Sequence, residues 1–77
     1  MKKKNGVVET YYDNGQLMSR SNYENDKLDG LQETWYENGK PKERATCKDG
    51  ELNGLYERWD ERGNLIESTM YKDGVKQ

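Results

Sequence analysis

The sequence predicts an all-β fold, an antiparallel meander of three consecutive β-hairpins (about six strands) in a single-layer repeat sheet with no helix. Two observations lead to this prediction. The chain repeats with a period of 24 residues, over 6–29 (copy one), 30–53 (copy two) and 54–77 (copy three). Each copy also carries a turn-forming dipeptide near its centre, and these dipeptides are Asn14-Gly15, Asn38-Gly39 and Arg62-Gly63.

The period also predicts the domain organisation. Residues 1–5 are expected to form a basic leader, and residues 6–77 a single repeat domain. Each copy opens with a glycine and continues with a glutamate and then an aromatic residue. These positions hold Gly6, Gly30 and Gly54, then Glu9, Glu33 and Glu57, then Tyr11, Trp35 and Trp59.

Each central dipeptide predicts a hairpin, because a two-residue type I′ turn needs positive φ at both positions, and Asn and Gly tolerate it best. The cross-strand pairs expected from such turns are Glu9 with Arg20, Tyr11 with Met18, Tyr12 with Leu17, Glu33 with Arg44, and Glu57 with Ser68. Opposite charges that face each other contribute about 0.2–1 kcal/mol, so the recurring Glu–Arg pairs support this register.

The hairpins are expected to be joined by segments 25–29 and 48–53. Connections this short keep successive strands adjacent and antiparallel. The first strand, near Val7, and the last, ending near Tyr71, would then be open edges of the sheet. Open edges favour pairing with another strand, so edge-strand pairing is expected, either with a second copy to form a homo-oligomer or with the sheet of a partner protein.

Side chains alternate along a strand and therefore divide between two faces of the sheet. One face is expected to carry Val7, Leu31, Leu55, Tyr11, Trp35, Trp59, Met18, Ile66 and Met70. The other is expected to carry Tyr12, Tyr36, Leu17, Leu65, Tyr23 and Tyr71. No residues are left for a second layer, so cross-strand ladders must hold the sheet together.

Composition bounds the fold further. With 30% hydrophobic and 36% charged residues, a chain of 77 residues has too little apolar surface for a two-layer core. Disorder is the rival interpretation, but disordered chains are poor in aromatic residues, and this chain has six Tyr and two Trp. A single cysteine excludes an internal disulfide, and no apolar run reaches the length of a signal or membrane segment. A cytoplasmic location is therefore expected.

Each copy approximates Gly-x-x-Glu-x-aromatic-aromatic-acid-Asn-Gly-x-Leu, then a tyrosine, then Asp-Gly-x-x-x-Gly. This pattern resembles the variant MORN repeat over residues 6–77. Copy two departs from it at Pro41 and Cys47, and copy three at Asp60 and Arg62. The resemblance implies an extended array of β-hairpins that serves as a partner-binding scaffold, in some proteins linked to a membrane. It also implies a link to bacterial proteins that are often labelled antitoxins.

The residue inventory argues against an enzyme. The chain has no histidine and a single cysteine, Cys47, and it lacks Ser-x-x-Lys and Gly-x-Ser-x-Gly elements. No cofactor is expected. A calcium loop is the alternative for the segment with Asp49, Glu51, Asn53 and Asp60, but an EF-hand also needs flanking helices. No metal site is therefore expected.

The charge distribution argues against direct nucleic acid binding. Without Lys2, Lys3 and Lys4, the chain has 10 basic and 15 acidic residues, a balance that repels a phosphate backbone. Those three lysines are the residues that could contact an anionic membrane.

Two functions remain, both of which depend on a protein partner. The first is a small inhibitor or antitoxin-like neutraliser of a partner, with a nuclease or other nucleic-acid enzyme as the favoured class because its groove is basic. The second is a structural or membrane-apposed scaffold. The expected binding surface centres on copy three, where apolar side chains surround Glu57, with aromatic residues of the other copies beside it. Its residues are Leu55, Trp59, Ile66, Met70, Trp35 and Tyr11.

Overall fold

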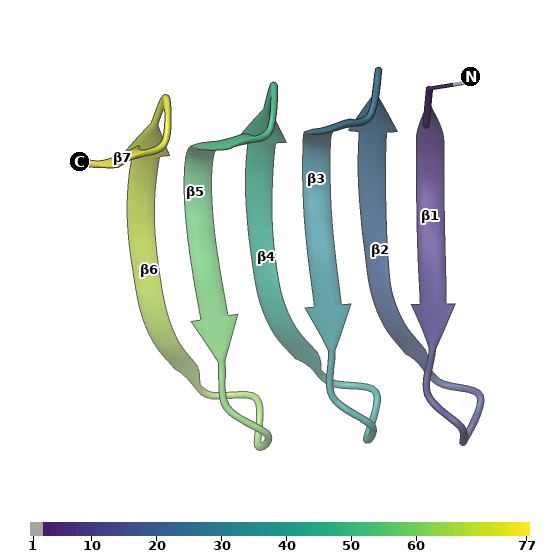
Figure 1. Ribbon diagram of the computed structural model, residues 1–77. Coiled ribbons are helices and arrows are strands. Elements are labelled where there is room, and N and C mark those ends of the chain that lie inside the picture. The colour runs from purple at the N-terminus through teal and green to yellow at the C-terminus, as the bar shows by residue number, and fades with distance from the viewer. Residues whose placement is uncertain (1–2) are drawn as a thin grey trace.

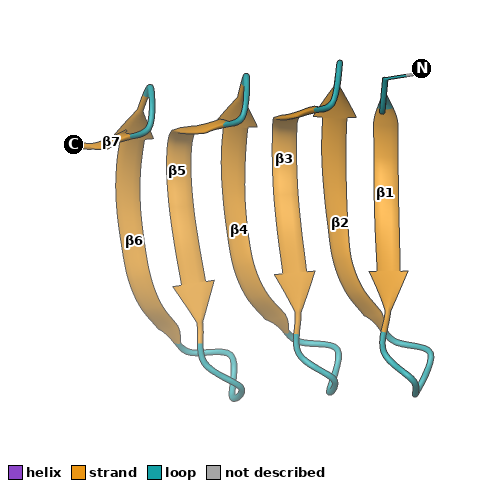
Figure 2. Ribbon diagram, viewed as in Figure 1, coloured by secondary structure: helices purple, strands orange, loops and turns teal. Residues whose placement is uncertain are grey.

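The computed structural model describes residues 3–77 and shows one antiparallel sheet of seven strands in sequence order. Figures 1 and 2 show the strands side by side, with turns at both ends of the sheet. The all-β meander is confirmed, and residues 3–77 contain no helix. The strands are β1 (Gly6–Tyr11), β2 (Leu17–Glu24), β3 (Lys27–Trp35), β4 (Pro41–Lys48), β5 (Glu51–Trp59), β6 (Leu65–Lys72) and β7 (Val75–Lys76).

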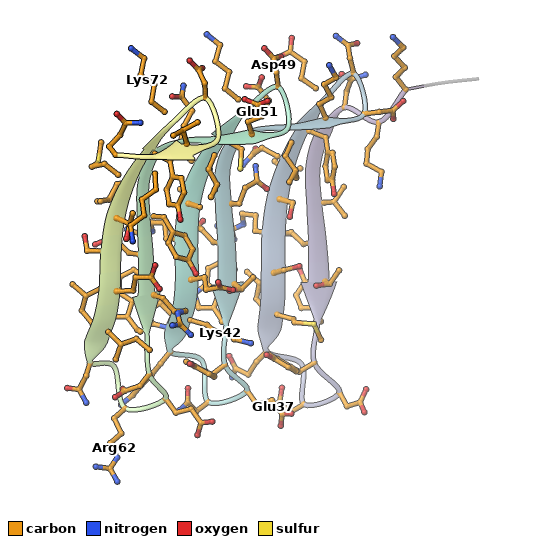
Figure 3. All side chains as sticks on the ribbon, turned by 60° about the vertical axis from the view of Figure 1, so that its left-hand side comes forward. Glu37, Lys42, Asp49, Glu51, Arg62 and Lys72 are labelled. Atoms are coloured by element: carbon orange, nitrogen blue, oxygen red, sulfur yellow. The ribbon has the colours of Figure 1, made fainter. Side chains whose placement is uncertain are left out.

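The sheet is a single layer. The molecule measures 38 × 33 × 10 Å, and Figure 3 shows side chains projecting from both faces without a covering element. Within the described residues the buried hydrophobic side chains are Ala45 and Cys47, which are 8% and 7% exposed. Both lie on the same face of β4, so the core is a patch in the middle of one face.

A three-residue loop, and not the expected two-residue turn, closes each central hairpin. The Tyr12 amide donates to the Gln16 carbonyl, and the Gly15 amide donates to the Tyr12 carbonyl. This is a type I turn followed by a left-handed glycine, with Gly15 at φ 88°. Because the glycine alone takes positive φ in these loops, copy three tolerates Arg62 at the position of the asparagines.

The three-residue loop changes the pairing of the residues next to the turn. The residues farther from the turn pair as predicted. The expected pairs of Tyr11 with Met18 and of Tyr12 with Leu17 are wrong, because Tyr11 lies opposite Leu17. A bulge then restores the predicted register one pair farther along each strand. The confirmed pairs are Glu9 with Arg20, Glu33 with Arg44, and Glu57 with Ser68.

Two-residue turns occur at the opposite end of the sheet. Asn25-Asp26, Asp49-Gly50 and Asp73-Gly74 each have positive φ at both residues, between 50° and 84°. The expected connecting segments 25–29 and 48–53 are therefore largely strand, since β3 begins at Lys27 and β5 at Glu51. Asp-Gly fits this turn for the same reason as Asn-Gly does, because both residues accept left-handed backbone.

The last of these turns adds a seventh strand. Val75 pairs with Lys72, and Lys76 pairs with Tyr71. The Gln77 amide also donates to the Met70 carbonyl at 2.8 Å. The edge of β6 is therefore covered only at its end, near Tyr71. Within residues 3–77 the rest of that edge has no neighbouring strand, and neither has the outer edge of β1, as expected.

The glycines that open copies two and three form corners. In Figure 1, β3 and β5 first run across the end of the sheet and then turn to follow it. Gly30 and Gly54 lie at these bends with φ 101° and 126°, where the pairing with the preceding strand is interrupted. The corner brings the backbone at Gly54 against Thr46 on β4.

The substitution Gly54→Ala should destabilise the protein. A Cβ at this position would lie 3.3 Å from the Thr46 Cβ, and the positive φ adds backbone strain, which together cost about 1–3 kcal/mol. Urea unfolding followed by circular dichroism measures this loss. Gly15→Ala is the matched control, because its φ is also positive but a Cβ there meets nothing within 4 Å. An equal loss in both variants would exclude the contact with Thr46 as a cause.

Candidate functional site

One face of the sheet carries a row of side chains, one from each of the six long strands, and the five from β1 to β5 are charged. Cross-strand pairing places the row in the order Glu9, Arg20, Glu33, Arg44, Glu57 and Ser68, from β1 to β6. We call this row the charged row, and the face that carries it the ladder face. The row exists because each copy contributes its glutamate from an odd-numbered strand, and copies one and two contribute an arginine from the next strand.

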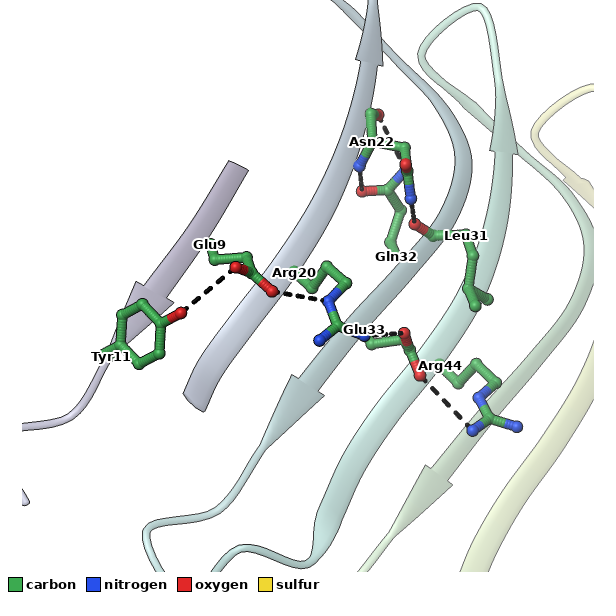
Figure 4. A network of polar contacts seen from close by, with 8 residues as sticks. All are labelled: Glu9, Tyr11, Arg20, Asn22, Leu31, Gln32, Glu33 and Arg44. Atoms are coloured by element: carbon green, nitrogen blue, oxygen red, sulfur yellow. Dashed lines mark hydrogen bonds and ion pairs between the residues drawn. The ribbon is translucent and has the colours of Figure 1, made fainter. Parts of the chain in front are cut away.

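Ion pairs connect the first four members of the charged row. The Arg20 Nε lies 2.9 Å from the Glu9 Oε2, and the Arg20 Nη1 lies 3.8 Å from the Glu33 Oε1. The Arg44 Nη2 then lies 3.5 Å from the Glu33 Oε2. Figure 4 shows this chain of contacts across β1 to β4. The hydrogen bond to Glu9 raises the pKa of Arg20, which further favours the charged form of its guanidinium.

The charged row is incomplete in copy three. Arg44 and Glu57 are cross-strand neighbours, but within residues 3–77 no ion pair involves Glu57. Its other neighbour in the row is Ser68, which carries no charge. Copy three instead pairs Arg58 with Glu67, at 3.4 Å on the opposite face. Within the part of the chain that the structure describes, the Glu57 carboxylate on the ladder face therefore has no ion pair.

A second row on the ladder face is largely apolar and exposed. It runs from β1 to β6 in the order Val7, Asn22, Leu31, Thr46, Leu55 and Met70, and we call it the apolar row. Val7 and Met70 are 57% and 52% exposed, and Leu31 and Leu55 are 39% and 40% exposed. Asn22 and Thr46 interrupt the row, so its apolar side chains are adjacent only at Leu55 and Met70, and exposed apolar neighbours of this kind are typical of interaction surfaces.

The structure brings most of the predicted binding residues together on copy three. Leu55 lies directly opposite Met70, and Ile66 on the same strand is 52% exposed. Trp59 is the last residue of β5 and is partly buried. The altered register adds Leu65, which lies opposite Trp59 and is 52% exposed. The sequence analysis placed Leu65 on the other face because it assumed a two-residue turn.

The two remaining predicted residues lie in the other copies. Tyr11 on β1 is 56% exposed, and its hydroxyl donates to Glu9 at 3.2 Å. Trp35 on β3 is partly buried, and the Arg20 guanidinium lies 5.6 Å from the centre of its ring. Both aromatic residues therefore contact a charged side chain of their own chain on the ladder face: Tyr11 contacts Glu9, and Trp35 contacts Arg20.

The opposite face, which we call the shielded face, holds the most buried side chains of the sheet. It contains Ala45 and Cys47, and beside them the Tyr56 hydroxyl donates to Glu43 at 2.6 Å. Burial and this hydrogen bond raise the pKa of Tyr56 to about 12. Burial also raises the pKa of the Cys47 thiol, which disfavours the reactive thiolate. The shielded face therefore stabilises the sheet and offers less accessible apolar surface than the ladder face.

Side-chain hydrogen bonds also link successive copies, at repeat positions that the sequence predicts only as turn residues or as members of one face. The Tyr12 hydroxyl donates to the Trp35 carbonyl at 2.7 Å, and the Tyr36 hydroxyl donates to the Trp59 carbonyl at 2.8 Å. Asn14 and Asn38 donate in the same way to the loop of the next copy. Their spacing of one period is the sequence signal that could have identified these contacts.

Copy three replaces these donors with Asp60 and Arg62. Asp60 accepts hydrogen bonds from the backbone amides of Arg62 and Asn64, and these bonds lower the pKa of its carboxyl group. The Asp60 carboxylate is thus engaged in its own turn and is a poor candidate for a calcium ligand. Within residues 3–77, no group of three or more His, Cys, Asp or Glu side chains is placed to hold a metal ion.

The repeat geometry agrees with a known repeat family. The family model of the MORN repeat variant matches residues 4–25, 28–49 and 52–73, most of the chain. The chain belongs to the MORN repeat variant family. Each MORN match begins where a backbone carbonyl, of Lys4, Leu28 or Leu52, accepts a hydrogen bond from the two-residue turn of the neighbouring hairpin. No curated protein and no solved structure shows significant similarity to the chain.

Family membership bears on function at a general level. MORN repeats are generally non-catalytic and form protein-interaction or scaffold modules. Across residues 3–77 there is no helix long and apolar enough to cross a membrane. Of the three lysines with a predicted membrane role, Lys2 lies outside the described residues. Lys4 is held at the end of the sheet, with its ammonium 4.7 Å from the centre of the Tyr23 ring.

Proposed function

We propose that this MORN protein is a non-enzymatic binding module that contacts a partner protein through the copy-three end of the ladder face. The observation that carries this proposal is the exposure of Leu55, Ile66 and Met70 around a carboxylate, Glu57, that has no ion pair within residues 3–77. A partner that covers this patch with apolar atoms and places a basic side chain near Glu57 would satisfy both features.

The favoured consequence of binding is inhibition of the partner. A single-layer sheet 10 Å thick presents a broad face that can lie over a groove of the partner. The chain has a formal net charge of −2, which favours a partner whose functional surface is basic. An antitoxin-like neutraliser of a nuclease or another nucleic-acid enzyme in the cytoplasm fits this description. A scaffold is the alternative, and it would use several copies equally.

The variants Trp59→Ala and Ile66→Glu test this proposal. Truncating a central aromatic residue in an interface costs about 2 kcal/mol or more in binding free energy, a factor of about thirty in affinity. The parent chain would first be used to isolate its partner from the native host. Calorimetry would then measure the affinity of each variant for the purified partner.

Tyr11→Ala and Met18→Glu provide the matched controls, because they make the same changes at the equivalent positions of copy one. They should weaken binding much less. All four variants must first give the circular dichroism spectrum of the parent. If folded copy-three variants bound as tightly as the parent, the partner would bind elsewhere, and equal losses in both copies would favour the scaffold.

A further inference from the structure

The charged row has an order that makes it complementary to itself. Its glutamates lie on the odd-numbered strands β1, β3 and β5, and its arginines lie on β2 and β4. Reversing the order of six strands exchanges odd and even positions. A reversed copy of the row therefore presents an arginine wherever the original has Glu33 or Glu57, and a glutamate wherever it has Arg20 or Arg44.

We propose that a second copy of this chain covers the ladder face, so that two sheets pack face to face about a two-fold axis parallel to the strands, between β3 and β4. This inference rests on the proposed function, because it names an occupant for the same interaction face when no other partner is bound. Rotation by 180° about this axis leaves each row at the same position along the strands, which we call its height. The rotation also reverses the order of the strands, so β1 of one chain faces β6 of the other.

The charge complementarity follows directly. Glu33 meets Arg44 of the second copy, and Glu57 meets Arg20 of the second copy. Each contact occurs twice because of the symmetry. The two pairs nearest the axis join the existing pair of Glu33 and Arg44, at 3.5 Å, into a cluster of four alternating charges. Glu57 gains the cationic partner that its own chain does not provide within residues 3–77.

Other face-to-face arrangements lack this property. A two-fold axis in the plane of the sheets but perpendicular to the strands preserves the strand order. With that axis at the height of the charged row, Glu33 would lie over Glu33 of the second copy and Arg44 over Arg44 of the second copy. Like charges directly opposed across an interface cost several kcal/mol. The charged row therefore selects the axis parallel to the strands.

The apolar row and the size of the face are consistent with a stable dimer. The same axis places Val7 opposite Met70 of the second copy, Leu31 opposite Thr46 and Leu55 opposite Asn22, so each exposed aliphatic side chain of the apolar row is covered by the second copy. The sheet measures 38 × 33 Å, so its face covers roughly 1,200 Å², more than the roughly 800 Å² that each partner of a stable complex buries. Two such sheets about 10 Å apart would form a sandwich with its core between them.

Ser68 allows the arrangement to be tested in both directions. It is exposed, ends the charged row, and would face Glu9 of the second copy. Ser68→Arg should tighten the dimer and Ser68→Glu should loosen it, each by about tenfold, because two symmetric contacts change at once. Sedimentation equilibrium of the purified full chain, from about 1 µM to several hundred µM, measures the dissociation constant of the dimer.

Thr10 provides the matched control on the opposite face. It is exposed, and it alternates with Glu9 along β1. Thr10→Arg and Thr10→Glu should leave the dissociation constant within about twofold of the parent. A parent chain that stays monomeric at all these concentrations would overturn the inference. A dimer whose dissociation constant is unchanged by both Ser68 variants would also overturn it, and would indicate pairing along β1. These outcomes are measured without any other protein, so they are independent of the partner-binding test with Trp59 and Ile66.

Discussion

A chain truncated after Lys48 should fail to fold, although it retains two complete hairpins. The truncation removes β5, β6 and β7. Ala45 pairs with Tyr56, and Cys47 pairs with Leu52, so both buried side chains of β4 lose the strand beside them. What remains is a sheet of four strands with no buried side chain. The fragment keeps the ladders of β1 to β4 and the ion pairs from Glu9 to Arg44, but because each copy of a repeat array buries its apolar surface against its neighbours, these contacts alone should not hold it folded.

Circular dichroism during heating measures this effect. The full chain should show a cooperative loss of its β-sheet signal, whereas the fragment should show a spectrum without sheet and no transition. A chain truncated after Lys72 is the control, because it loses β7 and keeps the neighbours of Ala45 and Cys47. It should unfold cooperatively. A cooperative transition in the shorter fragment would contradict the view that the copies stabilise one another.

The strands and most of the register could be predicted from the sequence because they depend on local signals. The 24-residue period located six of the seven strands, and the recurring Glu–Arg pairs, such as Glu33 with Arg44, set the register. The expected single layer followed from composition. These predictions needed only the alternation of side chains and the short distance between turns.

The turn types could not be assigned in the same way. Asn-Gly and Asp-Gly have similar intrinsic preferences, so the local residues alone do not decide which turn has two residues and which has three. The decision depends on pairing along the whole strand. Glu24 pairs with Lys27 directly across Asn25-Asp26, whereas a bulge at Leu17 accommodates the longer loop. The seventh strand was missed because Val75 and Lys76 are too few residues to show alternation.

Part of the candidate binding surface could also be predicted from the sequence. Exposure of Leu55, Ile66 and Met70 follows from the absence of a second layer, and the lack of a partner for Glu57 follows from Ser68 in the next strand. Leu65 was missed because its face depends on the loop length. The self-complementary order of the charged row became evident once the pairs between copies, such as Arg20 with Glu33, were established.

The substitution Cys47→Asp should unfold the protein. Cys47 is 7% exposed, and burial, with a smaller contribution from the carboxylate of Asp29, already raises the pKa of its thiol. A second carboxylate at this position would lose most of its hydration and would be repelled by Asp29. Burying such a charge without a partner costs about 3 kcal/mol or more. A single-layer sheet of 77 residues has a stability of only a few kcal/mol, so this loss is comparable to the whole.

Thr46→Asp is the matched control, because Thr46 is the preceding residue on β4 and is exposed on the ladder face. It introduces the same side chain at nearly the same place in the sequence. Urea unfolding should show a folded Thr46→Asp variant with stability within about 1 kcal/mol of the parent, and no native baseline for Cys47→Asp. Lowering the pH toward 3 should partly restore the folded state of Cys47→Asp, because protonation removes the buried charge. If Cys47→Asp folded as stably as Thr46→Asp at neutral pH, the face containing Ala45 and Cys47 would not be the core of the sheet.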